Sequence, residues 1–325
     1  MVMKVALVVG TYNGAKVIGK CVDSLLRTDY PDKEVIVVDD GSTDSTQEVL
    51  RTYGGKIRVL RKERGGVSSA RNHAAERTDA ELVATTDNDC EVTPGWISSA
   101  VRHFSSSEVG AVTGEKKYRI TNTVSAVRSA EYAVRFRKRG KEANSIECPC
   151  AVIRRDAWLK IGGFNTGTKV GGEDTEFGYR LRKRGYRIVY DSNVVVYHDS
   201  EDSLRMYAKR NYRNGVAYVR NFLWNKRESV TDDFFPTTLK LQPAFNLAFL
   251  AFLATGMILA DGFLLSLAAV VFGAISALFY PILNEIRKSK GFASLPFSLA
   301  ILHLRNVVWS AALFAGAFKY WRPWR

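Results

Sequence analysis

Cysteine is scarce in this chain of 325 residues, which contains only Cys21, Cys90, Cys148 and Cys150. A single proline separates the last two, and no Cys-x-x-Cys pair occurs, which argues against a zinc ribbon or a dithiol redox site. So few cysteines are typical of a reducing compartment, and we expect all four thiols to be reduced. Internal repeats and low-complexity segments are absent as well.

A secretory leader is also missing at the start of the printed sequence. Lys4 leads into a short run typical of a β-strand, without the apolar segment and small-residue cleavage site of a signal peptide. We therefore expect the N-terminal region to remain in the cytoplasm.

Charge is absent from two long stretches near the C-terminus. Residues 244–260 and 263–283 contain no charged side chain, and only Asp261 and Gly262 separate them. A helix needs about 20 apolar residues to cross a bilayer. The two stretches predict a transmembrane hairpin, because the rest of the chain is too small to bury both as core helices.

A third apolar stretch, residues 297–318, contains His303, Arg305 and Asn306 near its middle. It either spans the membrane or lies at the interface as a broken amphipathic helix. The connecting loop predicted at residues 284–291 carries three basic side chains, which the positive-inside rule places in the cytoplasm. The sequence therefore predicts a multi-pass protein of the cell membrane with a cytoplasmic N-terminal domain.

Acidic side chains are too few to balance the basic ones. The chain has 47 Lys and Arg against 33 Asp and Glu, a net charge of +14. Most of the excess lies between Lys116 and Arg220, where 23 basic residues accompany 11 acidic ones. A basic region next to membrane helices suits anionic lipid headgroups or phosphorylated substrates. Nucleic acid is the other usual partner of a basic protein, but the apolar tail argues against it, and we predict no nucleic-acid partner.

Apolar strands alternate with amphipathic helices over the first hundred residues. The predicted strands are residues 4–9, 34–38, 56–60 and 81–84, and the predicted helices are residues 15–27, 42–50 with Ser42 as its cap, and 67–77. This order implies an α/β domain with a parallel sheet covered by helices. A helix at 95–104 and a strand at 110–114 continue the same arrangement.

The pattern is looser after residue 115. Further strands are predicted at 151–154, 187–190 and 194–197, and further helices at 125–139 and 174–184.

Residues 202–224 have the spacing of an amphipathic helix. Its apolar residues form one stripe, and four basic residues, Arg220 among them, lie largely outside that stripe. Such a helix just before a membrane hairpin is typical of the membrane interface, although an ordinary surface helix has the same pattern. We therefore predict three regions, which are a Rossmann-like domain over 1–200, an interface helix with a linker over 201–235, and a membrane domain over 236–325.

Polar side chains follow three of the predicted strands. The first strand leads into Thr11, Tyr12 and Asn13, the second into Asp39 and Asp40, and the fourth into Asp87 and Asp89. Parallel strands end at the same edge of a sheet, so these loops should line one cleft. Two carboxylates two residues apart suit a hard divalent cation that bridges phosphate oxygens, although a solvated turn often has the same pattern. With Tyr12 to stack on a base and Asp40 to accept a hydrogen bond from it, the cleft fits a nucleoside diphosphate.

These residues resemble the motifs of glycosyltransferase family 2, whose members have the GT-A nucleotide-sugar fold. The resemblance extends over most of residues 4–225. Five motifs occur in the family's order and spacing, namely Thr11-Tyr12-Asn13, residues 37–44, Ala70-Arg71-Asn72, Asp87-Asn88-Asp89 and Gly172-Glu173-Asp174. Each motif is weak alone, but the ordered set is specific. Gly10 is a departure, since the family usually has proline there.

The resemblance implies how the nucleotide is bound. Asp40 would recognise the base, Thr11 and Tyr12 would line its pocket with Asn13 beside them, and Arg71 would reach the base or the diphosphate.

The resemblance also implies a metal site and a catalytic base. Asp87 would contact the ribose or the metal, and Asp89 would bind the metal, which is Mg²⁺ or Mn²⁺. His198 is either a further ligand or a satisfied core histidine. Asp174 would be the general base that deprotonates the acceptor hydroxyl, with Glu173 as the alternative. The reaction would be a single displacement with inversion.

Arg210 and Arg213, in the predicted interface helix, are candidates for neutralising phosphate charge on the leaving group or the acceptor. Processive membrane synthases carry Gln-x-x-Arg-Trp at this position, and only the arginine matches here. The missing residues argue against the synthesis of long polymers.

The expected function is transfer of a hexose from GDP-mannose or a UDP-hexose to a membrane-lipid-linked acceptor, either polyprenyl or dolichyl phosphate or a lipid-linked oligosaccharide. One alternative is a small processive polysaccharide synthase of the cellulose or hyaluronan synthase type. Another is a non-catalytic membrane scaffold, which the intact Asp87, Asp89 and Asp174 argue against. A basic lipid- or nucleic-acid-binding protein is a third, and its binding would be sensitive to salt but independent of those carboxylates.

Overall fold

The computed structural model describes residues 2–137, 139–167, 172–199, 203–224 and 237–320. The chain divides into two compact units. The N-terminal unit comprises Met1–Lys117, Arg139–Lys169 and Glu173–Ser200, and the C-terminal unit comprises Tyr118–Lys138, Val170–Gly172 and Glu201–Arg325. Tyr118–Lys138 thus groups with the C-terminal helices, although the sequence analysis included it in the first domain. Most of the predicted linker after residue 224 lies outside the described residues.

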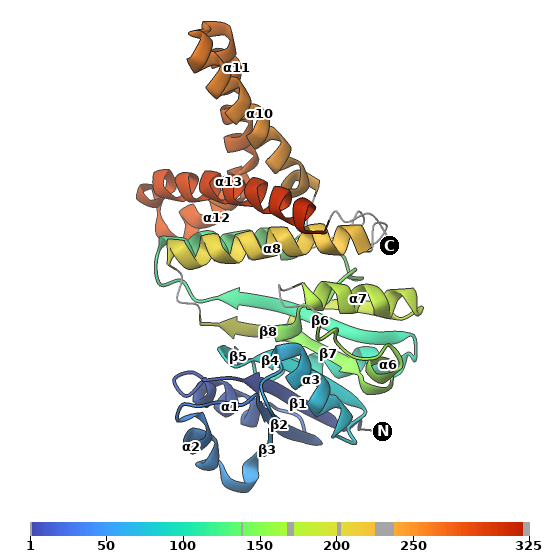
Figure 1. Ribbon diagram of the computed structural model, residues 1–325. Coiled ribbons are helices and arrows are strands. Elements are labelled where there is room, and N and C mark those ends of the chain that lie inside the picture. Colours follow the sequence, from blue (N-terminus) through green and yellow to red (C-terminus); the bar gives the residue numbers. More distant parts are fainter. Residues whose placement is uncertain (1, 138, 168–171, 200–202, 225–236, 321–325) are drawn as a thin grey trace. The chain divides into compact units, whose positions relative to one another are not determined.

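The N-terminal unit is built on one eight-stranded sheet with the order β3-β2-β1-β4-β7-β6-β8-β5 (Figure 1). The strands are β1 (Val5–Thr11), β2 (Lys33–Asp39), β3 (Arg58–Arg61), β4 (Leu82–Asp87), β5 (Cys90–Val92), β6 (Val109–Tyr118), β7 (Ala151–Arg154) and β8 (Arg187–His198). β1 pairs in parallel with β2 and β4, and β2 pairs in parallel with β3. The predicted parallel arrangement is confirmed for these four strands.

The other half of the sheet is antiparallel. β7 pairs antiparallel with both β4 and β6, and β5 pairs antiparallel with β8. The expectation that the strand at 110–114 simply extends the parallel sheet is wrong, because β7 lies between it and β4. The two short strands predicted at 187–190 and 194–197 are one continuous strand, β8. The sequence pattern gave no sign of β5, because three residues are too few to show a period.

Helices cover both faces of this sheet. They are α1 (Ile18–Leu26), α2 (Thr46–Arg51), α3 (Val67–Glu76), α4 (Trp96–Val101), α6 (Arg155–Lys160) and α7 (Glu173–Lys183), with 3-10 turns at Gly54–Lys56, Arg102–Ser105 and Cys148–Cys150. Alternate residues of β1 point to opposite faces. Val5, Leu7 and Val9 pack with α1, α2 and α4, whereas Ala6 and Val8 pack with α3, α6 and α7. Burial on both faces explains why β1 is a continuous apolar run.

The predicted cap of α2 is wrong. This helix begins at Thr46, and Ser45 before it makes no side-chain cap bond. Ser42 instead stabilises the loop after β2, since its N–H donates to Asp39 Oδ1 (2.9 Å) and its hydroxyl accepts from the N–H of Asn13 (3.0 Å). Short polar side chains bond to nearby backbone in turns as readily as in helix caps, so the sequence alone does not separate the two.

The described part of the C-terminal unit is helical. Its helices are α5 (Thr123–Arg137), α8 (Leu204–Trp224), α10 (Thr237–Leu259), α11 (Gly262–Leu278), α12 (Tyr280–Lys290) and α13 (Leu295–Tyr320), with a 3-10 turn at Phe292–Ser294. α8 packs along α13, and α10 packs against α11 (Figure 1). Asp261 lies in the turn between α10 and α11 and caps α11 by accepting from the N–H groups of Phe263 and Leu264. The polar turn predicted inside the hairpin therefore forms.

The buried face of α8 only partly matches the predicted apolar stripe. Tyr207 and Val216 are buried as expected, but Tyr212 is exposed and Arg220 is buried. The guanidinium of Arg220 donates to the amide oxygen of Asn221 from two nitrogens, at 3.2 and 3.1 Å. Hydrogen bonding inside the unit lets a cation occupy this face, which apolar periodicity does not reveal.

Within the described residues, two helical segments are long and apolar enough to cross a membrane, Gln242–Leu259 and Phe292–Tyr320, and α11 with α12 would make a third if the bent pair is one span. The stretch at 297–318 lies inside the unbroken helix α13, so the expected break is wrong, and whether this helix spans the membrane or lies at the interface stays a prediction. The stretch at 263–283 is not one straight helix, since the chain bends by 57° between α11 and α12. Pro281 near the start of α12 explains the bend, because proline has no N–H to continue the α11 ladder. The loop predicted at 284–291 is largely helical and belongs to α12.

Buried polar contacts join four helices of this unit. Arg305 on α13 is 1% exposed, forms an ion pair with Glu131 on α5, and donates to Gln242 Oε1 on α10 at 2.5 Å. Trp309 of α13 donates from Nε1 to Asn211 Oδ1 of α8 at 3.0 Å. Buried charges are tolerated only when they are paired and hydrogen-bonded, so these bonds fix which faces of the four helices meet.

Replacing Arg305 by leucine should lower the stability of the protein in detergent by about 3–5 kcal/mol, because Glu131 is left buried without its cation. The double variant Arg305→Leu/Glu131→Leu should lose clearly less than the sum of the two single variants. Thermal unfolding in detergent measures both effects, with Arg287→Leu on the exposed part of α12 as the matched control. Additive losses in the double variant would show that the pair is not energetically coupled.

Candidate active site

The carboxyl ends of β1, β2 and β4 meet at one edge of the sheet, as predicted. The parallel register aligns Thr11 with Asp39 and Gly10 with Asp87. Beside these ends is a cleft of about 460 Å³, a volume typical of small-ligand sites. The predicted site residues in its lining are Thr11, Tyr12, Asp40, Arg71, Asp87, Asp89, Glu173 and Asp174.

Asp40 organises one part of this cleft and is 4% exposed. Its carboxylate accepts from Lys62 Nζ (2.9 Å) and from the N–H groups of Gly65 (2.9 Å) and Gly66 (2.6 Å). Gly66 has a φ of 88°, a left-handed conformation that glycine adopts without strain and that allows its N–H to face Asp40. The N–H of Gly65 also reaches Asp40 Oδ2 at 3.1 Å, so each carboxylate oxygen accepts from two donors and the carboxylate holds the loop after β3.

Tyr12, the predicted platform for a base, is covered by Arg64. The Arg64 guanidinium lies 4.0 Å from the centroid of the Tyr12 ring and donates to the Tyr12 hydroxyl at 3.3 Å. A planar cation on an aromatic face occupies the kind of space that a stacked base takes. Thr11 links this loop to the end of β4, since its hydroxyl accepts from Asn88 Nδ2 at 3.1 Å.

Arg71 on α3 is the buried cation of the cleft, with 2% of its surface exposed. Its Nη2 lies 2.6 Å from Asp87 Oδ1, and its Nη1 lies 3.9 Å from Glu173 Oε1. Burial alone would lower the pKa of Arg71, but Cys148 and the nearby carboxylates raise it above its ordinary value. Nε and Nη1 have no hydrogen-bond partner among the described residues, so the guanidinium has donors left for an anionic ligand.

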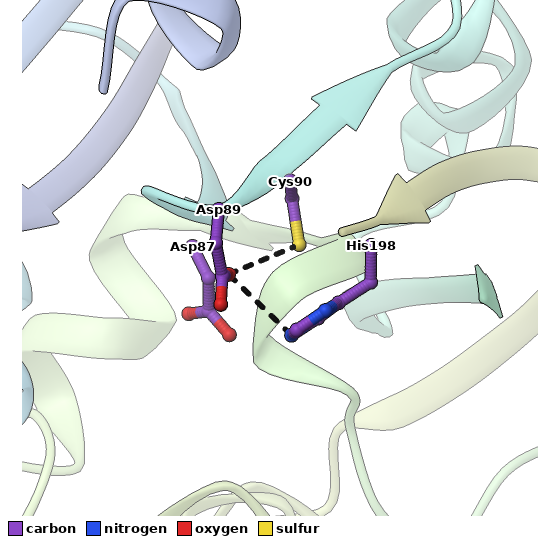
Figure 2. Close-up of side chains that lie close together, drawn as sticks. All are labelled: Asp87, Asp89, Cys90 and His198. Carbon is purple, nitrogen blue, oxygen red and sulfur yellow. Dashed lines mark hydrogen bonds and ion pairs between the residues drawn. The ribbon is translucent and has the colours of Figure 1, made fainter. Parts of the chain in front are cut away.

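Asp87, Asp89, Cys90 and His198 form a cluster of the kind that holds a metal ion (Figure 2). One ligand atom from each side chain lies within 4.8 Å of all the others. Asp89 Oδ1 is 3.4 Å from His198 Nε2 and 3.8 Å from Cys90 Sγ. Of the two sequence alternatives for His198, the structure places the ring beside the Asp-x-Asp motif, and its role as a ligand stays a prediction.

Glu173 and Asp174 begin α7 and are half-buried in the cleft. Nearby, Lys116 of β6 forms a buried ion pair with Glu147, with 3.3 Å between Nζ and Oε2. Burial, followed by the negative charges of Glu173 and Glu147, raises the pKa of Asp174 to about 7. A carboxylate with a pKa near neutrality is suited to accept a proton during a reaction.

Four predicted site residues are not part of the cleft lining, namely Asn13, His198, Arg210 and Arg213. His198 lies instead in the cluster with Asp87, Asp89 and Cys90. Asn13 has a φ of 48° and accepts at its side-chain oxygen from the N–H of Thr43 (2.9 Å), so it shapes the loop after β1. Arg210 and Arg213 lie on α8 in the C-terminal unit. Their proposed contact with phosphate stays a prediction.

Arg64, Lys116 and Cys90 were not predicted from the sequence as members of the site. Arg64 follows β3, and Lys116 lies near the end of β6, which runs in the same direction as β4, so the rule that ligands gather at carboxyl ends of strands was a usable signal for both. Cys90 offered no such signal, because its closeness to His198 depends on the pairing of β5 with β8.

Comparison with known proteins agrees with this geometry. Residues 6–162 match the model of glycosyl transferase family 2. Glycosyltransferase AglE of Haloferax volcanii is 24% identical over 230 residues, which cover 68% of this chain and 75% of that protein. Chondroitin synthase of Pasteurella multocida is 34% identical over 103 residues, which cover 31% of this chain but only 11% of the synthase.

Among solved structures, mannosyltransferase PcManGT from Pyrobaculum calidifontis, in complex with GDP-Man and Mn²⁺, is similar with a TM-score of 0.59 and 23% sequence identity. The similarity covers 98% of this chain and 87% of that one, and it shows a shared fold. The matched family domain, the fold and the glycosyltransferase relatives together show that this chain is a glycosyltransferase with a family 2 domain of the GT-A fold.

Proposed function

We propose that the chain is an inverting, metal-dependent hexosyltransferase that transfers one sugar from a nucleotide sugar to an acceptor carried by a membrane lipid. The observation that carries this proposal is the content of one cleft, which holds the cluster of Asp87 and Asp89, the buried Arg71, and Asp174 with its raised pKa. These are the parts that transfer with a diphosphate leaving group requires.

The cluster of Asp87, Asp89 and His198 fits a divalent cation by the chemistry of its donors, since carboxylate oxygens and an imidazole nitrogen bind such ions. A bound Mg²⁺ or Mn²⁺ would neutralise charge on the diphosphate as it leaves. Arg71 adds a fixed positive charge from α3. These charges act in a partly buried site, where electrostatic stabilisation is stronger than in water.

Asp174 is the proposed general base. Its carboxylate would take the proton from the attacking acceptor oxygen, which belongs to a sugar hydroxyl or to the P–OH group of a lipid phosphate. That oxygen attacks the anomeric carbon on the side opposite the leaving diphosphate, whose bond to this carbon breaks. Inversion at that carbon follows from a single displacement. Glu173 keeps the alternative role, since it precedes Asp174 and its charge helps raise the pKa of Asp174.

The donor is proposed to be GDP-mannose or a UDP-hexose. Asp40 and Tyr12 line the cleft at the expected base position, where a stacked base would take the place that Arg64 occupies over the Tyr12 ring. The structurally similar PcManGT, solved with GDP-Man and Mn²⁺, supports GDP-mannose as the first donor to test.

A membrane-bound acceptor is supported by the C-terminal unit. Large apolar side chains are exposed there, including Met257 (69%) and Ile258 (82%) at the end of α10 and Phe318 (92%) on α13. Exposed apolar surface of this kind is typical of contact with lipid. Residues of α5 and α8 also line a small cavity of about 20 Å³, in which Arg128, Arg135 and Arg210 accompany Glu131. A cavity of this size holds about one water molecule, so it contributes basic charge on these helices and not a headgroup pocket.

Asp89→Ala should lower turnover of the correct nucleotide sugar by about 100-fold or more, because the diphosphate loses its charge-neutralising metal. Release of nucleoside diphosphate from a panel of UDP- and GDP-sugars, with Mn²⁺ and purified protein in detergent, measures this. Asp156→Ala, a surface carboxylate on α6, is the matched control and should keep full activity. Unchanged turnover in Asp89→Ala or in the presence of EDTA would contradict the metal-dependent mechanism.

The dependence of kcat on pH should follow the protonation state of Asp174. The base must be deprotonated, so kcat should fall about tenfold per unit below pH 7 and reach a plateau above it, since burial raises the pKa to about 7. Asp174→Asn should remove most activity at every pH while nucleotide binding is retained. A wild-type profile that stays flat down to pH 5 would exclude Asp174 as the base.

The acceptor should be lipid-linked and should receive a single sugar. When the assay is run in detergent micelles, polyprenyl phosphate should be glycosylated at least tenfold faster than a water-soluble sugar acceptor at the same concentration. Mass spectrometry of the product distinguishes the addition of one sugar from the addition of many. A ladder of products would favour a processive polysaccharide synthase instead. Equal rates of glycosylation for the soluble acceptor and for polyprenyl phosphate would contradict the proposal that the acceptor is lipid-linked.

A further inference from the structure

Cys90 is the one member of the metal-type cluster that the proposed mechanism leaves unused. Its Sγ lies 3.8 Å from Asp89 Oδ1 and points into the group formed by Asp87, Asp89 and His198 (Figure 2). The side chain is 1% exposed, so the sulfur reaches the cluster from inside the protein.

The sheet itself holds Cys90 next to His198. β5 and β8 pair antiparallel, and the register places Cys90 directly opposite His198. Directly opposed residues of an antiparallel pair project their side chains to the same face, with their Cβ atoms about 4.5–5.5 Å apart. The N–H of Asp199 donates to the carbonyl oxygen of Asp89 at 3.0 Å, which fixes the Asp-x-Asp loop to the same ladder. The sulfur and the imidazole are thus placed by backbone pairing.

The spacing of the cluster is compatible with one shared ion. A metal–sulfur distance is about 2.3 Å and a metal–nitrogen distance is about 2.1 Å. A sulfur atom and a nitrogen atom on opposite sides of one ion therefore lie about 4.4 Å from each other. The four ligand atoms already lie within 4.8 Å of one another. Small side-chain adjustments would therefore bring all four onto a single cation.

The donor set discriminates between metals. Mg²⁺ prefers oxygen ligands in near-ideal octahedral geometry, and two carboxylates with water would satisfy it. Imidazole and thiolate are ligands of transition metals, whose affinity for such sites rises from Mn²⁺ through Co²⁺. A site that offers one nitrogen and one sulfur beside two carboxylates should therefore favour a transition metal.

We infer that Cys90 is a fourth ligand of the metal site and that, together with His198, it makes this site select a transition-metal ion over Mg²⁺. Coordination of the sulfur releases the thiol proton to solvent. The inference rests on the proposed metal-dependent function and deepens it by specifying the class of ion.

Cys21 provides a matched control. It is buried to the same extent as Cys90, and its Sγ contacts the backbone carbonyl oxygen of Asp87 at 3.3 Å. It is a neighbour of the Asp-x-Asp loop but is not a member of the metal-type cluster. A Cys21 variant therefore shows the effect of altered packing near this loop without the loss of a proposed metal ligand.

The first experiment is a Co²⁺ titration of the full-length protein in detergent, followed by absorption spectroscopy. Wild type and Cys21→Ser should both show a near-ultraviolet sulfur-to-cobalt charge-transfer band, and Cys90→Ser should lack it. Cys90→Ala, with thermal unfolding to verify folding, serves as the second variant. A wild-type cobalt spectrum without a sulfur band would overturn the inference even if no Cys90 variant folds.

The second experiment is calorimetric titration with Mn²⁺ and with Mg²⁺. Wild type should bind Mn²⁺ more tightly than Mg²⁺, and Cys90→Ser should reduce that preference by about tenfold or more, the scale of effects seen for groups around metal ligands. An unchanged Mn²⁺-to-Mg²⁺ ratio in Cys90→Ser would overturn the inference while leaving the proposed function intact. No binding of any divalent ion to wild type would instead remove the metal from the proposed function itself.

Discussion

The register of three parallel strands is the constraint on which the candidate site depends. Because β1 is paired on both sides, the ends of β2 and β4 are held level with its own end, and Asp39 and Asp87 each align with a residue of that end. Asp40, Asp87 and Asp89 thus share one cleft, where their negative charges disfavour one another unless cations lie among them. Lys62 meets Asp40, and Arg71 meets Asp87, so the protein supplies part of that charge itself. The cluster of Asp87, Asp89 and His198 is where a further cation is expected.

The antiparallel half of the sheet adds what the parallel half lacks. Lys116 comes from β6 and His198 from the end of β8, and the pairing of β8 with β5 sets Cys90 opposite His198. Without the antiparallel pairing of β5 with β8, Cys90 and His198 would not lie opposite each other beside the Asp-x-Asp loop. The mixed sheet therefore decides which donors lie around the proposed metal position.

Periodicity and strand-end position were sufficient to predict the parallel strands and most residues of the cleft, because both depend on local sequence. β5 and the placement of β7 escaped prediction, since a three-residue strand has no period and an antiparallel insertion depends on long-range pairing. Arg220 was assigned to an exposed face for a related reason, because its burial depends on a partner, Asn221, and not on apolarity. The helix break at Pro281 was readable in principle from proline chemistry, but the uncharged run around it hid the signal.

The C-terminal unit combines two features that ordinarily exclude each other. Its surface exposes large apolar side chains, which suits lipid, while its interior holds Arg305 paired with Glu131 and bonded to Gln242. An ion pair inside helices of this composition contributes little net stability, because desolvation offsets most of the attraction. Its effect is on specificity. Without this bonding, α5, α10 and α13 could slide or rotate against one another at small energetic cost, whereas Arg305 meets both partners in only one arrangement. The pair therefore selects a single packing of these three helices.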